Sequence, residues 1–143
     1  MTTTPIDRMP PHAIEAEEAV LGSILIDPEA YFRVSSFLKA DDFYIVKHQW
    51  VWVAATTLHE RHAPIDFVTT TKELEARGQL AEIGGPAFVS RLINVVPTAI
   101  HAEGYGHIVE CMANRRRLLS AASEIAQLAY DETIDDDVIS DRA

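Results

Sequence analysis

The stretch PPHAIEAEEAVLGSILIDPEAY, residues 10–31, contains the pattern that decides the fold class. Its apolar side chains recur every third or fourth residue, which predicts a helix over about residues 13–26. Acidic side chains occupy the first turns, where the helix dipole favours negative charge. Asp27 precedes Pro28, so the first helix ends there. The same aspartate is a good cap for a second helix, which we expect to run to about residue 38.

The middle of the chain also reads as helices separated by short breaks. Residues 46–62 have two interpretations, because their WVWV sequence favours a strand locally, whereas apolar side chains over the whole segment recur at helical spacing. We predict a helix there, after a loop over residues 39–44. Further helices are expected over residues 67–77, with Gly78 as a left-handed cap, and from Pro86 onward.

A long helix is predicted over residues 98–130, where neither proline nor a late glycine interrupts an apolar stripe. The stripe has two interpretations, namely packing within the domain or a helical hairpin that also contacts other subunits. DETIDDD, residues 131–137, is then a turn, and VISDRA begins an antiparallel partner helix. The candidate interface residues on the stripe are Tyr105, Ile108, Met112, Leu118, Leu119, Ile125 and Leu128.

The predicted fold is therefore all-α, a compact helical bundle followed by a long helix that begins a helical hairpin. We expect a flexible arm at residues 1–12, a globular helical subdomain at 13–97 and a hairpin subdomain at 98–143, whose second arm is truncated. A stripe without its partner arm exposes apolar surface, and such surface promotes self-association. Dimers or larger species are expected.

Composition narrows the function classes. The formal net charge of −10 over 143 residues repels phosphate backbones, which disfavours nucleic-acid binding by this chain alone. Cys111 is the single cysteine, so no intramolecular disulfide forms, which fits a reducing compartment. No stretch approaches the roughly 20 apolar residues that span a bilayer. We expect a cytoplasmic protein with no membrane partner.

No motif in the sequence predicts catalysis, a cofactor or a metal site. The chain contains neither GxxxxGK[ST] nor GxGxxG, so it has no P-loop for ATP. HERH places His59 and His62 three residues apart, which predicts that they share one helical face. No cysteine or patterned carboxylate completes a metal site, and a solvated helix end is the simpler interpretation. The four other histidines are expected at the surface or the core edge, and they are His12, His48, His101 and His107.

Two charged clusters also have simpler interpretations. The RRR run at residues 115–117 points in directions about 100° apart on a helix, so we expect solvated or salt-bridged arginines, not a flat basic patch. Asp41 and Asp42 precede an aromatic residue in a loop, where a helix cap is expected. Cys111 has no patterned base beside it, which disfavours a nucleophile.

The order of short motifs resembles one known family, the N-terminal domain of the bacterial replicative DNA helicase of DnaB type. Each motif is weak alone, and seven occur in family order from about residue 9 to 143. The matching segments are PPHAIEAEEAVLGSILID (10–27), DDFY with a following histidine (41–44 and 48), PID (64–66), GG (84–85), VPTA (96–99), Y with IV (105 and 108–109), and an R-L-A-I series (116–125).

The resemblance implies a non-catalytic collar domain of a hexameric helicase, often arranged as a trimer of dimers with hairpins that pair between subunits. The collar would dock the C-terminal domain of primase, and the stripe residues would serve the oligomer or the primase. ATP and magnesium would act in a separate motor domain, through which DNA is contacted only indirectly. Gly22 would allow two helices to approach closely, and Glu17 and Asp66 would be caps or buried hydrogen-bond partners.

Other interpretations stay open at this stage. The helicase-binding domain of a primase resembles the same fold, and a stand-alone adaptor could mimic the collar. A small metal protein built on HERH and a DNA-binding module are the remaining alternatives, and metal analysis and a salt-dependent titration with single strands would test them.

Overall fold

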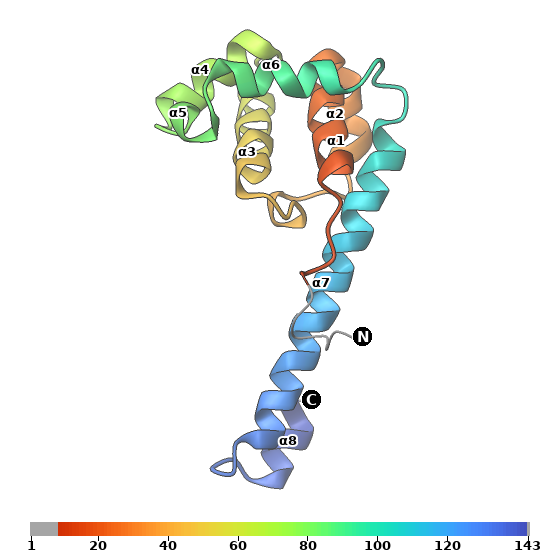
Figure 1. Ribbon diagram of the computed structural model, residues 1–143, viewed down its shortest axis with the longest axis vertical. Helices are drawn as coiled ribbons and strands as arrows, with labels where there is room; N and C mark the ends of the chain where they lie inside the picture. Colours follow the sequence, from red (N-terminus) through yellow and green to blue (C-terminus); the bar gives the residue numbers. More distant parts are fainter. Residues whose placement is uncertain (1–8, 143) are drawn as a thin grey trace. The chain divides into compact units, whose positions relative to one another are not determined.

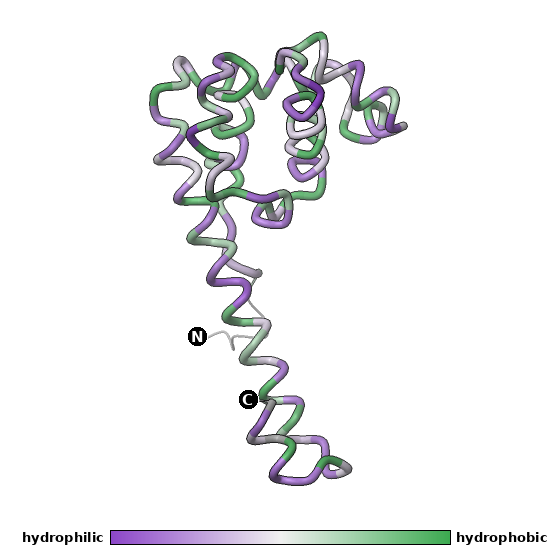
Figure 2. The backbone as a smooth tube through the Cα atoms, turned by 180° about the vertical axis from the view of Figure 1, so that it is seen from behind, coloured by the Kyte–Doolittle hydropathy of each residue, from purple (hydrophilic) through white to green (hydrophobic). Residues whose placement is uncertain are grey.

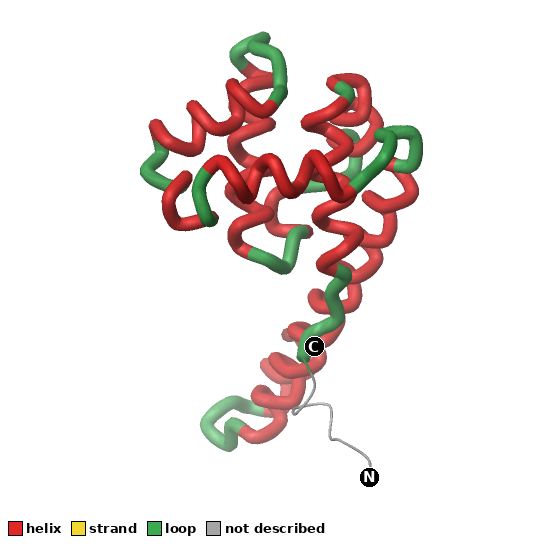
Figure 3. Tube along the Cα trace, turned by 45° about the horizontal axis from the view of Figure 1, so that its top comes forward, coloured by secondary structure: helices red, strands yellow, loops and turns green. Residues whose placement is uncertain are grey.

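Helices and their connections make up the whole described part of the chain (Figures 1 and 3). The computed structural model describes residues 9–142, and over these residues it contains α-helices, one short 3₁₀ helix and no strand. This confirms the predicted all-α fold. The elements in chain order are α1 (Ile14–Ile26), α2 (Pro28–Ser35), η2 (Ala40–Asp42), α3 (Val46–Glu60), α4 (Phe67–Ala76), α5 (Leu80–Ile83), α6 (Pro86–Val95), α7 (Ala102–Tyr130) and α8 (Asp136–Arg142).

The chain divides into two compact units, and α7 contributes residues to both. One unit comprises His12–Ala113, and the other combines the residues up to Pro11 with Asn114–Ala143. The domain boundaries expected from the sequence stay a prediction. Most of the arm expected at residues 1–12 lies outside the described residues.

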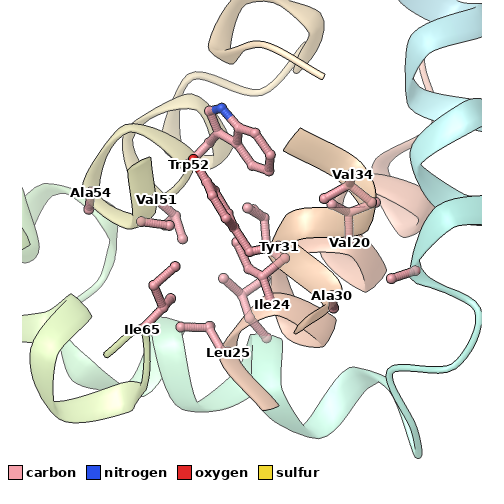
Figure 4. Close-up of a cluster of buried hydrophobic side chains, with 14 of the residues drawn as sticks. Val20, Ile24, Leu25, Ala30, Tyr31, Val34, Val51, Trp52, Ala54 and Ile65 are labelled. Carbon is pink, nitrogen blue, oxygen red and sulfur yellow. The ribbon is translucent and has the colours of Figure 1, made fainter. Parts of the chain in front are cut away.

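Helix α1 is the central helix of the His12–Ala113 unit. Every residue from Ala16 to Leu25 is buried, because α2, α3 and α6 all pack against this helix. A helix that is apolar on nearly all sides is stable in water only when it is surrounded in this way. Full burial of one Leu, Ile or Val side chain stabilises the fold by roughly 1.5–3 kcal/mol. Figure 4 shows side chains of α1, α2 and α3 meeting in this core.

Helices α1 and α6 approach each other closely at Gly22, which confirms the role expected for this glycine. A Cβ atom built at this position would lie 2.1 Å from the carbonyl oxygen of Leu92 on α6 and 3.2 Å from Cγ2 of Val96. Only a residue without a side chain therefore allows α1 and α6 to pack at this separation.

The predicted caps end and begin the helices as expected. The Asp27 carboxylate accepts a hydrogen bond from Glu29 N–H at 3.0 Å, which starts α2 one residue after α1 ends. The Asp66 carboxylate accepts from Thr69 N–H at 2.9 Å at the start of α4. Gly78 has φ +70°, the left-handed conformation predicted for it.

Two helix boundaries and one short α-helix differ from the sequence prediction. Helix α2 ends at Ser35 instead of residue 38, and the short helix α5 was not predicted, because four residues between glycines carry no readable period. Helix α7 begins at Ala102 instead of residue 98. Arg33 on α2 donates a hydrogen bond to the carbonyl oxygen of Ala99 at 3.1 Å, which holds this carbonyl in the preceding loop.

Candidate protein–protein interface

The seven interface residues predicted from the sequence all lie on α7, but the two compact units divide them. Tyr105, Ile108 and Met112 belong to the His12–Ala113 unit, and the other four belong to the second unit. Ile108, Leu118, Leu119 and Ile125 are exposed, whereas Tyr105, Met112 and Leu128 are half-buried. Figure 2 shows hydrophobic and hydrophilic residues alternating along this helix.

A different row of small residues attaches the first turns of α7 to its own unit. Its members are Ala102, Gly106, Val109 and Ala113, the buried residues of the helix. A Cβ atom at Gly106 would lie 3.0 Å from Cζ of Phe37 and 3.1 Å from Cγ1 of Val34, so this turn packs tightly against the end of α2. The sequence analysis missed this row, although its spacing of four, three and four residues is a helical signal.

Beyond Ala113, the side chains of α7 are largely exposed. Leu118 is 72% exposed, Leu119 is 46% exposed and Ile125 is 44% exposed. Two leucines and an isoleucine on successive turns of one helix are more apolar surface than isolated side chains explain. This segment is the strongest candidate for an interface within the described residues.

The end of α7 and the following turn form a shallow hollow with a volume of about 590 Å³, lined by Ile125, Leu128 and Ile134 together with polar residues. The Asp131 carboxylate accepts hydrogen bonds from the backbone N–H and the hydroxyl of Thr133, and these bonds lower its pKa. This local turn reverses the chain before α8, which confirms the predicted start of a helical hairpin.

Two arginines of the RRR run form hydrogen bonds within their own unit, which agrees with the prediction that the run is not a flat basic patch. Arg116 donates a hydrogen bond to the carbonyl oxygen of Pro11 at 2.8 Å, and Arg117 donates to Oδ1 of Asn114 at 3.0 Å. These guanidinium groups hold neighbouring parts of their own unit. They therefore do not form one flat basic surface.

The prediction that all four remaining histidines lie at the surface or the core edge was wrong for His48. His48, expected at the surface or core edge, is 2% exposed, and its Nδ1 lies 2.8 Å from Oε1 of Glu17. Glu17 also accepts hydrogen bonds from the backbone N–H groups of Tyr44 at 2.7 Å and Ile45 at 3.3 Å. The buried carboxylate thus fastens the loop before α3 to α1, the buried partner role expected for Glu17.

The HERH histidines do not share one helical face. His59 packs against the rings of Tyr31 and Phe32, and His62 lies beyond the end of α3 with φ +60°. Within residues 9–142, no group of three or more histidine, cysteine, aspartate or glutamate side chains is placed to hold a metal ion. The Asp42 carboxylate accepts from Lys39 N–H at 2.8 Å, the capping role expected for this cluster.

The buried carboxylate of Glu73 pairs with two arginines. Burial raises the pKa of its carboxyl, but hydrogen bonds and positive charge from Arg77 and Arg61 outweigh burial, and the net pKa is lowered. Arg61 Nη1 lies 2.8 Å and Arg77 Nε 3.0 Å from the carboxylate. This cluster joins α4 to the end of α3, and its role is structural.

No helix in the described part of the chain is both long enough and apolar enough to cross a membrane.

Comparison with known proteins gives consistent matches. The sequence model of one family, the DnaB-like helicase N terminal domain, matches residues 9–111. The replicative DNA helicase DnaB of Geobacillus stearothermophilus is 44% identical over 137 residues, which cover 96% of this chain and 30% of that protein. The replicative DNA helicase DnaC of Bacillus subtilis (strain 168) is 44% identical over 130 residues, which cover 91% of this chain and 29% of that protein.

A solved structure agrees with these relatives. The crystal structure of the N-terminal domain of DnaB helicase from Mycobacterium tuberculosis matches with a TM-score of 0.89 and 37% identity, covering 94% of this chain and 96% of that one. The chain thus matches nearly all of that crystallised domain, and it spans less than a third of the length of the two helicases above.

Proposed function

The chain belongs to the DnaB-like helicase N-terminal domain family, and from that premise we propose that it is the non-catalytic collar domain of a hexameric, ATP-dependent replicative DNA helicase. The domain pairs with copies of itself and docks the C-terminal domain of primase during DNA replication. ATP and magnesium act in the motor domain of the parent helicase, and DNA is contacted only through that parent. We expect the domain to act in the cytoplasm.

The exposed apolar seam of α7 is the observation that carries the proposal. Leu118, Ala121, Ile125 and Leu128 follow one another at spacings of three, four and three residues. This is the spacing of the buried positions of a two-stranded coiled coil. Two such seams from neighbouring copies bury each other's leucine and isoleucine side chains.

The size of the effect follows from the exposure of these side chains. Full burial of a Leu or Ile side chain is worth roughly 1.5–3 kcal/mol. Leu118 is 72% exposed and Ile125 is 44% exposed in the single chain, and a two-fold dimer contains each of them twice. Their burial therefore contributes about 3 kcal/mol at the lower end. Loss of that contribution weakens self-association by about a hundredfold.

Analytical ultracentrifugation over a wide concentration range tests self-association. The chain is expected to form dimers or larger species, and the double variant Leu118→Asp, Ile125→Asp is expected to be monomeric. The control carries Ser120→Asp and Ser123→Asp, two aspartates at exposed positions on other sides of the same helix. A wild-type chain that stays monomeric at several hundred micromolar, or a control that dissociates equally, contradicts the proposal.

Primase docking needs a separate binding measurement. The immobilised chain is expected to bind the purified C-terminal domain of primase and not an assembled replicative helicase. The opposite preference supports the alternative, in which the domain derives from a primase or an adaptor. The helicase descriptions of the relatives favour the first outcome.

A further inference from the structure

A second apolar surface lies in the His12–Ala113 unit, whereas the seam of α7 proposed for self-association belongs to the other unit. It is a groove with a volume of about 660 Å³ between α1, the end of α6 and the first turns of α7. Figure 1 shows these three segments next to one another. Ala16 and Ala19 of α1 line the groove, and its larger apolar side chains are Val95, Tyr105 and Ile108. Val95 and Ile108 are each more than 40% exposed.

The charged side chains that line this groove are all acidic. Glu15 and Glu18 are its charged lining residues, and no lysine, arginine or histidine lines it. Glu18 is 92% buried and its Oε2 lies 2.8 Å from Nη2 of Arg91, so its charge is compensated. Glu15 is exposed and has no ion-pair partner among residues 9–142. The groove therefore combines an apolar surface with one uncompensated carboxylate.

We propose that this groove is a docking site for a short cationic, amphipathic helical segment of a partner protein. Leucine- or isoleucine-sized side chains of the segment pack against Val95 and Ile108, and a lysine or arginine beside them pairs with Glu15. The small side chains of Ala16 and Ala19 let the backbone of the segment approach α1 closely. Helix-in-groove recognition combines an apolar anchor with flanking charge in this way.

The chemistry of the groove favours a protein segment over the other possible occupants. A small molecule needs most of its surface enclosed, whereas this groove is open along one side. A second copy of this chain, with its net charge of −10, would bring like charge toward Glu15. A cationic segment instead meets an opposite charge, and its apolar face covers side chains that water now contacts.

This inference deepens the proposed docking role and rests on it, because Tyr105 and Ile108 line the groove and are also among the interface residues predicted from the sequence. It assigns these two residues to partner binding, and it leaves Leu118, Leu119, Ile125 and Leu128 to self-association. The two assignments fail separately, because Glu15 and Val95 lie outside the predicted self-association seam.

Fluorescence anisotropy with synthetic peptides of about 14 residues tests the groove. The first probe is an amphipathic helix with leucines at spacings of three and four and arginines flanking them. In the second probe glutamates replace the arginines, and in the third serines replace the leucines. The first probe is expected to bind at least tenfold more tightly than either of the others. Equal binding of the first two probes overturns the proposal.

Variants of the chain locate the binding. Glu15→Lys is expected to weaken binding of the cationic peptide three- to tenfold, whereas Glu29→Lys has no effect, because Glu29 is an exposed glutamate in the first turn of α2. Val95→Ser is expected to weaken binding similarly, whereas Val68→Ser, an exposed valine on α4, has no effect. Equal losses in the test and control variants overturn the assignment to this groove.

Ultracentrifugation of the same variants separates the two surfaces. Glu15→Lys and Val95→Ser are expected to self-associate like the wild-type chain, and the Leu118→Asp, Ile125→Asp variant is expected to keep its peptide affinity. If Val95→Ser dissociates the oligomer instead, the groove belongs to self-association and the proposal fails. Octylammonium, a small amphipathic cation, is a further competitor of the peptide. If it displaces the peptide and binds as tightly as the peptide does, the proposal is also overturned, because the groove would then be a site for small amphipathic cations.

Discussion

Replacement of Gly22 by alanine tests the packing of the two helices at the centre of the fold. The new Cβ would lie 2.1 Å from the backbone carbonyl oxygen of Leu92, and contacts below 3.0 Å are essentially never made by a Cβ atom. Helices α1 and α6 must therefore separate by about 0.9 Å. Because the contacted atom belongs to the backbone, no side-chain rotation relieves the clash, and a whole helix has to move.

The expected free-energy change is a balance of two effects. Overpacking of a core typically costs about 1–3 kcal/mol, and a backbone clash belongs at or above the upper end of that range. Alanine is favoured over glycine in a helix by about 1 kcal/mol, which offsets part of the cost. We expect the Gly22→Ala variant to lose about 2 kcal/mol of stability, which lowers the melting temperature by about 8 °C.

Two other glycines of the unit serve as matched controls for Gly22→Ala. A Cβ at Gly104 would meet nothing within 4 Å, so Gly104→Ala is expected to gain up to about 1 kcal/mol. A Cβ at Gly106 would meet side-chain atoms of Phe37 and Val34, which can adjust, so Gly106→Ala is expected to fall between the other two. Urea denaturation followed by circular dichroism measures all three. A Gly22→Ala variant as stable as the wild type refutes the reasoning, as does an equal loss in Gly104→Ala.

Two further predictions concern buried carboxylates. Glu17→Ala removes the acceptor of the N–H groups of Tyr44 and Ile45 and the partner of the buried His48. We expect this variant to lose about 3–5 kcal/mol of unfolding free energy, measured by urea denaturation. Glu17→Gln keeps one acceptor oxygen and is expected to lose less. The pKa of Glu73 is lowered in the folded state, so the carboxylate contributes stability above its ordinary pKa of 4.5, and this contribution disappears as the pH falls through the folded value. The stability difference between wild type and Glu73→Gln should therefore narrow below about pH 4.5, and a difference that is constant from pH 7 to pH 3 would contradict the assigned pKa.

Local features of the sequence were sufficient to place most of the helices. Asp27 with Pro28, Asp66 and Gly78 act on their own neighbours in the chain, so their effect is readable without a tertiary structure. The WVWV segment was ambiguous, because its local preference for a strand opposed its helical period. It is a helix, and its buried residues His48, Val51, Ala55 and Leu58 recur every three or four positions along one side.

The candidate interface was only partly readable from the sequence. Apolar spacing identified the stripe of α7, but spacing does not say which row a neighbouring helix covers. The row from Ala102 to Ala113 is covered because Gly106 admits the side chains of Val34 on α2 and of Phe37 just after α2. Leu118 and Ile125 are exposed because no helix of their unit covers them in the described residues. The groove at Glu15 combines residues more than 80 positions apart, which no local pattern relates.

The sequence by itself determined the all-α class, most of the helix ends and the family resemblance, because periodicity, caps and short motifs depend on neighbouring residues. The tertiary structure decided the pairing of Glu17 with His48, the contact of Gly22 with Leu92 and the start of α7 at Ala102. Each of these depends on a partner 31 to 70 residues away in the chain, and such a partner is specified only when the packed helices bring the two together.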